Sequence, residues 1–222
     1  MKFAFKGIVD KSKEVNGRVT LPFNVWEVSR HRDNINALMS IDGSEMMDCV
    51  LYPLEKGKYE IDVTHFDKEV PDGEHEFVLR IPASLPRLEK PAKYDFEHPI
   101  RKIDKVDIII QPEDGLCGQT CVAMLAGVTI QDVMDEMQCR EWQATMSMIV
   151  STLNHYGIKH ADTIYFTGGA DVDIPKCAVL MEKMGRFSHY LVAFDGKFYD
   201  PNLGVMDSYD TSKLVGYLEV EC

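Results

Sequence analysis

Residues 107–127, DIIIQPEDGLCGQTCVAMLAG, contain the change of pattern on which the predicted fold depends. An apolar run typical of a strand stops at a Pro, Asp and Gly turn, and a helix-like segment follows it. We expect this helix over residues 116–126, because Gly127 supplies a C-terminal stop. Cys117 then lies in the first turn and Cys121 one turn later. Either both thiols are buried packing residues, or one of them is a nucleophile.

The chain before this stretch has a different pattern. Short alternating segments run from Lys2 to about Ile81, separated by NG, DG and KG turn signals. This spacing is typical of strands joined by hairpins. We therefore expect residues 1–82 to form a small β-barrel domain or a strongly curled sheet, with one short helix at 24–33. Residues 83–106 contain scattered prolines among alternating charges, which predicts an extended linker or strap.

Residues 107–222 are expected to form the second domain, in which helices come first and strands follow. A second helix is predicted from Thr129, which is a good N-cap, and a third over residues 145–156, ended by Gly157. Strands are predicted at 176–182, 189–196 and 197–201. The overall fold class predicted is α+β.

Composition limits the classes of partner. The net charge is −12 and no dense Lys or Arg cluster is present, which argues against nucleic acid and against an anionic membrane surface. The N-terminal sequence lacks the apolar core of a secretory signal, and no stretch approaches the roughly 20 apolar residues of a membrane helix. We expect a cytoplasmic protein. Its 6 cysteines are widely scattered, which favours reduced thiols.

Cys117 is the better candidate nucleophile of the two helix cysteines. A thiol attacks as the thiolate, which a helix N-terminus or an imidazolium stabilises. Cys117 lies where the turn meets the helix, so the positive end of the macrodipole points at its sulfur, whereas Cys121 gains much less. Gln111, upstream across the turn, could fold back and donate to an oxyanion beside the Cys117 N–H.

A general base must come from far along the chain, and a carboxylate or amide must orient it. His189 begins one predicted strand and Asp200 ends the next, with a hairpin turn at Asp195-Gly196 between them. The two side chains therefore lie roughly opposite each other in the predicted hairpin, where a His–Asp contact is natural.

Residues 107–220 resemble the papain-like cysteine peptidases, and most closely the branch that processes bacteriocin leaders. The resemblance rests on Gln111, PEDGL, Cys117-Gly118, His189-Tyr190 and Tyr199-Asp200-Pro201, in that order. It implies a Cys-bearing helix packed on a twisted antiparallel sheet, a peptide or protein substrate, and no metal or organic cofactor.

The same resemblance implies a role for each motif residue. Cys117 would be the nucleophile, His189 the base, Asp200 the residue that orients His189, and Gln111 the oxyanion donor. Leu116 stands where the family often has an acidic residue, so chemistry carries over better than substrate choice.

The first half resembles the small β-barrel domain of the bacteriocin-protection (YdeI-like) kind. The segments that carry this resemblance are VTLPFNVWEV, MSIDG and LYPLEKGKYEIDV. It covers about residues 1–82, implies a barrel fold and names no catalytic residue.

Several alternatives remain open from the sequence. Cys117, Cys121 and Cys139 with His155 or His160 supply zinc-type ligands, although their spacing fits none of the CxxC pairings of structural zinc sites. Trp142 is interpreted as a core residue, with the edge of a substrate groove as the alternative.

The predicted activity is thiol-dependent hydrolysis of a peptide or other amide bond. A non-catalytic peptide-binding protein and an acyltransferase with the same triad are the alternatives.

Overall fold

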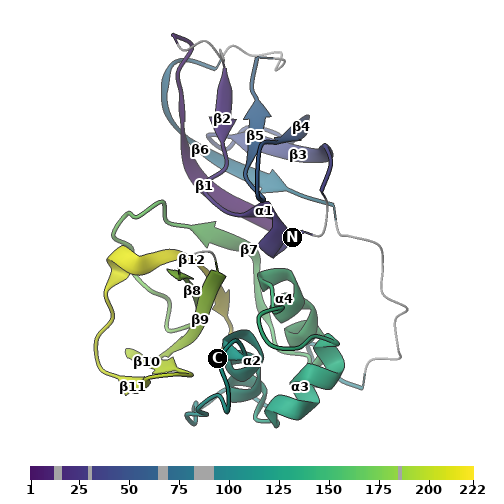
Figure 1. The fold of residues 1–222 in the computed structure, drawn as a ribbon, viewed down its shortest axis with the longest axis vertical. Coiled ribbons are helices and arrows are strands. Elements are labelled where there is room, and N and C mark those ends of the chain that lie inside the picture. The colour runs from purple at the N-terminus through teal and green to yellow at the C-terminus, as the bar shows by residue number, and fades with distance from the viewer. Residues whose placement is uncertain (13–16, 30–31, 65–69, 83–92, 185–186) are drawn as a thin grey trace. The chain divides into compact units, whose positions relative to one another are not determined.

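The computed structural model describes residues 1–222 except 13–16, 30–31, 65–69, 83–92 and 185–186 (Figure 1). The chain divides into two compact units. The first comprises Met1–Pro86 and Asp162–Gly168, and the second comprises Arg87–Ala161 and Gly169–Cys222. Part of the predicted linker, residues 83–92, lies outside the described residues.

The predicted fold class, α+β with a papain-like domain of helices packed on an antiparallel sheet, is wrong. Within the described residues, twelve strands join in one mixed sheet. Three short α-helices, a single-turn α-helix and a 3-10 helix (Thr211–Lys213) accompany them in the same described ranges. Three unpredicted strands enlarge the sheet: β7 (His160–Phe166), β11 (Gly204–Met206) and β12 (Leu214–Val220). The ladder between β1 (Lys2–Val9) and β7 is parallel, which makes the sheet mixed.

The strands of the first unit follow the order β7-β1-β6-β3-β4-β5-β2. Their bounds, besides those given, are β2 Arg18–Thr20, β3 Ile35–Ile41, β4 Met47–Pro53, β5 Tyr59–Asp62 and β6 Gly73–Arg80. They coincide with the alternating segments predicted for hairpin strands. β2 ends this strand order, where it pairs with β5, and Gly7 of β1 packs against the side chain of Val19 in β2. The predicted short helix is a single turn, α1 (Val25–Val28).

Aromatic side chains fill the core of the first unit. Phe5 stacks on Phe77 with ring centroids 5.2 Å apart, and Phe23 stacks on Phe166 at 4.1 Å. Phe3 and Phe5 both contact Phe23 as well. Alternation along β1 turns Phe3 and Phe5 to the same face, so one run of sequence supplies both rings.

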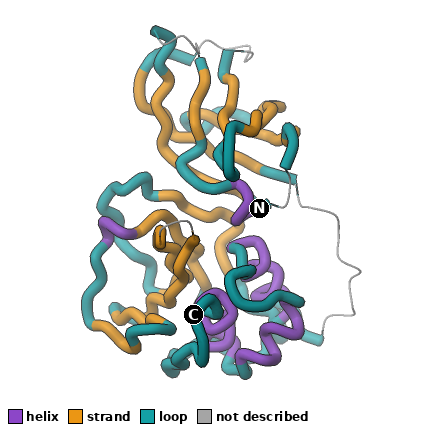
Figure 2. Tube along the Cα trace, in the orientation of Figure 1, coloured by secondary structure: helices purple, strands orange, loops and turns teal. Residues whose placement is uncertain are grey.

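The three helices of the second unit begin and end close to where the sequence predicts. They are α2 (Cys117–Ala126), α3 (Ile130–Met137) and α4 (Met146–His155), and Figure 2 shows them gathered together beside strands of the same unit. Thr129 forms a capping box at α3, and Gly127 ends α2 in the left-handed conformation at φ 66°. The run 107–110, however, is not a strand.

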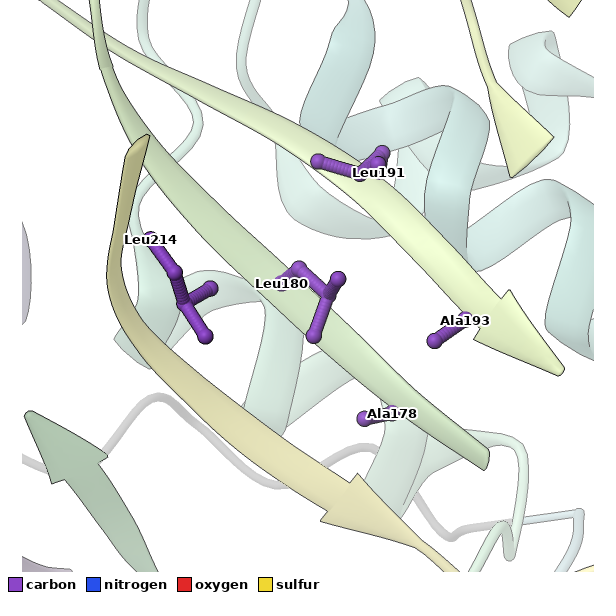
Figure 3. Packing of buried hydrophobic residues seen from close by; sticks show 5 residues of the cluster. All are labelled: Ala178, Leu180, Leu191, Ala193 and Leu214. Carbon is purple, nitrogen blue, oxygen red and sulfur yellow. The ribbon is translucent and has the colours of Figure 1, made fainter. Parts of the chain in front are cut away.

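The sheet strands of the second unit follow the order β11-β10-β9-β8-β12. Their further bounds are β8 Cys177–Met184, β9 Phe187–Phe194, β10 Lys197–Asp200 and β11 Gly204–Met206. The predicted turn between β9 and β10 is present, with Asp195 at φ 50° and Gly196 at φ 78°. A buried apolar cluster lies on β8, β9 and β12, formed by Ala178, Leu180, Leu191, Ala193 and Leu214 (Figure 3). This cluster packs β8, β9 and β12 together and so stabilises the part of the sheet to which the β9–β10 hairpin belongs.

In the part of the chain that the structure describes, no helix has both the length and the apolar character needed to cross a membrane.

Candidate active site

Cys117 is the first residue of α2. Leu116 precedes it as N-cap without any side-chain hydrogen bond to the helix, and no acidic residue lies in the first turn. The partial positive charge of the helix N-terminus is therefore not neutralised by a side-chain cap beside the Cys117 sulfur. The side chain is mostly buried, with Cys117 8% exposed.

His189 and Asp200 form a buried pair on neighbouring strands. Nε2 of His189 lies 2.9 Å from Oδ2 of Asp200, and both residues are about as buried as core side chains. The pairing of β9 with β10 brings them together. Val192 pairs with Tyr199 in this ladder, and His189 and Asp200 both lie just beyond that pair, on the side away from the turn. Oδ1 of Asp200 also accepts from the backbone N–H groups of Asn202 and Leu203, at 2.7 and 3.1 Å.

The Cys117 thiol lies beside the same imidazole and raises its pKa. Because Nε2 is engaged by Asp200, Nδ1 is the ring nitrogen that faces the sulfur. Cys117 from a helix N-terminus thus lies beside His189, which is hydrogen-bonded to Asp200 of a distant hairpin. A nucleophile, a base and a group that orients the base require this order of contacts.

Electrostatics in this chain favour a charged imidazole. Burial lowers the pKa of His189, but the hydrogen bond that the ring donates to Asp200 and the neighbouring Cys117 outweigh it and raise the pKa to about 10. For Asp200, burial raises the pKa, while His189 and the Asn202 N–H hold it below its usual value. Around neutral pH the site therefore contains an imidazolium between a carboxylate and a sulfur.

Gln111 lies against the turn that follows Asp200. Its backbone N–H donates to the carbonyl of Pro201 at 2.9 Å, and its side-chain Nε2 donates to Oδ1 of Asn202 at 2.5 Å. A primary amide has two N–H bonds, so one stays available after this contact. Its Oε1 is buried and has no hydrogen-bond partner among the described residues. A buried carbonyl without a partner is costly, which is typical of residues kept for function.

Cys121 is completely buried one turn into α2. Burial raises its pKa well above the usual thiol value, and the nearby Cys117 and Asp200 raise it further. The thiol therefore stays protonated at neutral pH. Cys121 is a packing residue of the helix.

The candidate zinc ligands are not brought together. Cys139 contacts Met137 and the side-chain amide of Gln119, whereas His155 faces Glu136. No group of three or more His, Cys, Asp and Glu side chains suited to a metal ion occurs in the described ranges.

Two residues near the site were not among its predicted members, although the edge of a substrate groove was the alternative for Trp142. Asn202 received no role, because only the folded turn brings it to Gln111; its place directly after Asp200-Pro201 was the one available signal. Trp142 was assigned to the core, which is wrong, since the side chain is 47% exposed.

No protein-family model matches the chain, and no curated protein is significantly similar to it. The assignment of this site therefore rests on the geometry of Cys117, His189, Asp200 and Gln111.

Proposed function

We propose that the protein is a thiol-dependent hydrolase of an amide bond, with a peptide as the substrate. The observation that carries the proposal is the buried His189–Asp200 pair with the Cys117 thiol beside the same imidazole. An isolated buried cysteine would need neither an imidazole at its sulfur nor a carboxylate behind that imidazole. The motif order of the peptidase resemblance favours the same activity.

In the proposed mechanism His189 has taken the thiol proton before the substrate arrives, and the Cys117 thiolate attacks the carbonyl carbon of the substrate. The backbone N–H of Cys117 and the second N–H of Gln111 stabilise the oxyanion. His189 then gives its proton to the leaving amine, and the C–N bond breaks. Water, deprotonated by His189, attacks the acyl-enzyme and releases the carboxylic acid and the free thiol. Asp200 keeps the imidazole oriented throughout.

The same groups support two other outcomes. An amine in place of water would take the acyl group and make the protein an acyltransferase. A protein that binds peptides without cleaving them would keep the pocket but not the turnover. We retain hydrolysis because water needs no binding site of its own, and we expect the protein to act in the cytoplasm.

The proposal is tested with a peptide library and a thiol-directed affinity reagent. Because Cys222 is exposed and would be labelled as well, all variants carry Cys222→Ser. Cys117→Ala should abolish cleavage and labelling, whereas the matched variant Cys121→Ala should keep both. Mass spectra of products formed with and without added amine separate hydrolysis from acyl transfer.

Cleavage that persists in Cys117→Ala would contradict the assigned nucleophile. Labelling of Cys117 without cleavage of any library member would favour the binding protein.

A further inference from the structure

Trp142 has an unusual backbone conformation and an unusual exposure. Its φ is 61°, in the left-handed region that bulky residues rarely adopt, and 47% of its surface is exposed. Both features are unfavourable in a residue without a role. Strained backbone of this kind gathers at binding and catalytic sites.

The turn that leads into Cys117 holds this conformation in place. The backbone N–H of Trp142 donates to the carbonyl of Gly115 at 2.9 Å. A methyl group built on Gly115 would lie 2.7–2.8 Å from three indole carbons, Cδ1, Cδ2 and Cε2. Nearly equal distances to three ring atoms mean that the indole lies face-on over Gly115. The ring therefore rests on the chain immediately before the nucleophile.

Phe187 continues the aromatic surface toward the base. Its ring centroid lies 4.9 Å from that of Trp142, with the planes tilted by 45°, and the residue is 36% exposed. It lies on β9 one alternation before His189, so the two side chains share a face of the strand. Trp142 and Phe187 are here called the aromatic ledge. Trp142 contacts Gly115, two residues before Cys117, and Phe187 lies on β9, two residues before His189.

We propose that the aromatic ledge is a substrate subsite that binds an aromatic or large aliphatic side chain of the peptide beside the scissile amide. The proposal rests on the proposed hydrolase function and names its substrate class. Since Cys117 and His189 are buried, the peptide must approach along the surface beside them. The ledge offers two exposed ring surfaces there, and apolar side chains gain most from covering such rings.

The aromatic ledge is tested with two alkylating reagents, iodoacetamide and N-benzyl iodoacetamide, which differ only by a benzyl group on the amide nitrogen. The measured quantity is the ratio of their second-order rate constants at Cys117, in full-length protein carrying Cys222→Ser. For wild type, the rate constant of the benzyl reagent divided by that of iodoacetamide should exceed the same ratio measured for the thiol of glutathione. Trp142→Gly and Phe187→Ala should each lower that preference, by roughly 2- to 10-fold from the usual strength of aromatic pairs. Trp142→Gly is chosen because glycine accepts positive φ without strain.

Trp26→Ala is the matched control, since Trp26 is also a partly exposed tryptophan, at 37%, but belongs to the first unit. Its benzyl preference should equal that of wild type. The proposal is overturned if wild type shows no preference beyond that of glutathione, or if both ledge variants keep it.

Cleavage assays separate this proposal from the function on which it rests. Peptides with Phe and with Ala beside the scissile bond should differ in kcat/KM, and the difference should shrink in both ledge variants. If no peptide is cleaved but the benzyl preference depends on Trp142 and Phe187, the hydrolase proposal fails and the subsite stands. Cleavage without any preference for Phe overturns the subsite alone.

Discussion

Asn202 accepts a 2.5 Å hydrogen bond from Nε2 of Gln111, while its own backbone N–H donates to Oδ1 of Asp200 at 2.7 Å. One residue thus contacts both the oxyanion-donor candidate and the carboxylate behind the base. Pro201 between them accepts from the Gln111 backbone. The turn after β10 therefore couples two parts of the proposed mechanism that are far apart in the sequence.

Asn202→Ala should lower kcat for peptide hydrolysis by about tenfold, less than the 100- to 1000-fold typical of removing an oxyanion donor itself. The reason is that the Gln111 amide loses its orientation but not its N–H groups. Alkylation of Cys117 should stay within about twofold of wild type, because it forms no oxyanion. Steady-state kinetics and iodoacetamide labelling measure the two quantities.

Leu203→Ala is the control for this variant, because Leu203 follows directly and is 74% exposed. It should leave kcat unchanged. If Asn202→Ala slowed alkylation and hydrolysis equally, Asn202 would act through Asp200 and His189 and not through Gln111.

The alkaline limit of hydrolysis should follow His189. Burial lowers its pKa, yet Asp200 and Cys117 raise it to about 10, so the imidazolium that protonates the leaving amine persists well above neutral pH. Its stabilising contribution is complete below the ordinary value of about 6.5 and is lost as pH rises through about 10. Asp200→Asn removes a contact that raises the pKa of His189, so the alkaline limb of the pH profile of kcat/KM should move to lower pH. An unchanged limb in Asp200→Asn would argue against the His189–Asp200 pair as its cause.

A second histidine makes the stability of the first unit depend on pH. Nδ1 of His75 lies 2.7 Å from Oδ2 of Asp42, and Nε2 lies 2.9 Å from the Pro71 carbonyl. Both oxygens only accept, so both ring nitrogens must donate and the imidazole is charged. The hydrogen bond to Asp42 is the main cause that raises the pKa of His75. The stabilisation is complete below pH 6.5 and declines as pH rises through the raised value.

His75→Ala should therefore lower the melting temperature more at pH 5.5 than at pH 9, by about 3 °C or more at the lower pH. Differential scanning calorimetry at both values gives the comparison. His98→Ala is the control, since His98 also faces a carboxylate but is largely exposed. Equal losses at the two pH values for His75→Ala would show that packing, and not charge, explains its effect.

Local signals predicted the parts of the fold that depend on a few neighbouring residues. Asp195 and Gly196 both adopt positive φ in the hairpin turn, as an Asp-Gly pair predicts, and this turn places His189 beside Asp200. Thr129 and Gly127 likewise cap their helices by contacts within one turn. The contact between β9 and β10 needed no information from elsewhere in the chain.

The parts that were not predicted depend on distant partners. The burial of β12 alternates, but its sequence LVGYLEV does not, because Val215 and Tyr217 lie on the less buried face and Gly216 on the buried one. The pairing register with β8 also shifts between Leu214 and Gly216. The strand β7, at residues 160–166, pairs in parallel with β1 at the start of the chain. The exposure of Trp142 depends on its contact with Gly115, which no periodicity encodes. For the same reason the bond from Gln111 to Asn202 could not be anticipated.

Gly115→Ala should destabilise the protein through Trp142. Gly43 and Gly115 both have positive φ, at 74° and 91°, so alanine strains either backbone by about 1 kcal/mol. They differ in surroundings: a methyl at Gly115 would lie 2.7 Å from the indole, whereas nothing lies within 4 Å of one at Gly43. Urea unfolding should give a loss roughly 1–2 kcal/mol larger for Gly115→Ala than for Gly43→Ala.

The double variant Gly115→Ala with Trp142→Gly identifies the source of this excess. With the indole removed, the cost of Gly115→Ala should fall to that of Gly43→Ala, because only the backbone strain remains. Alkylation of Cys117 should slow in Gly115→Ala and recover in the double variant, since the displaced turn carries the nucleophile. An excess that persisted without Trp142 would mean that the turn before Cys117 is held by something other than the indole.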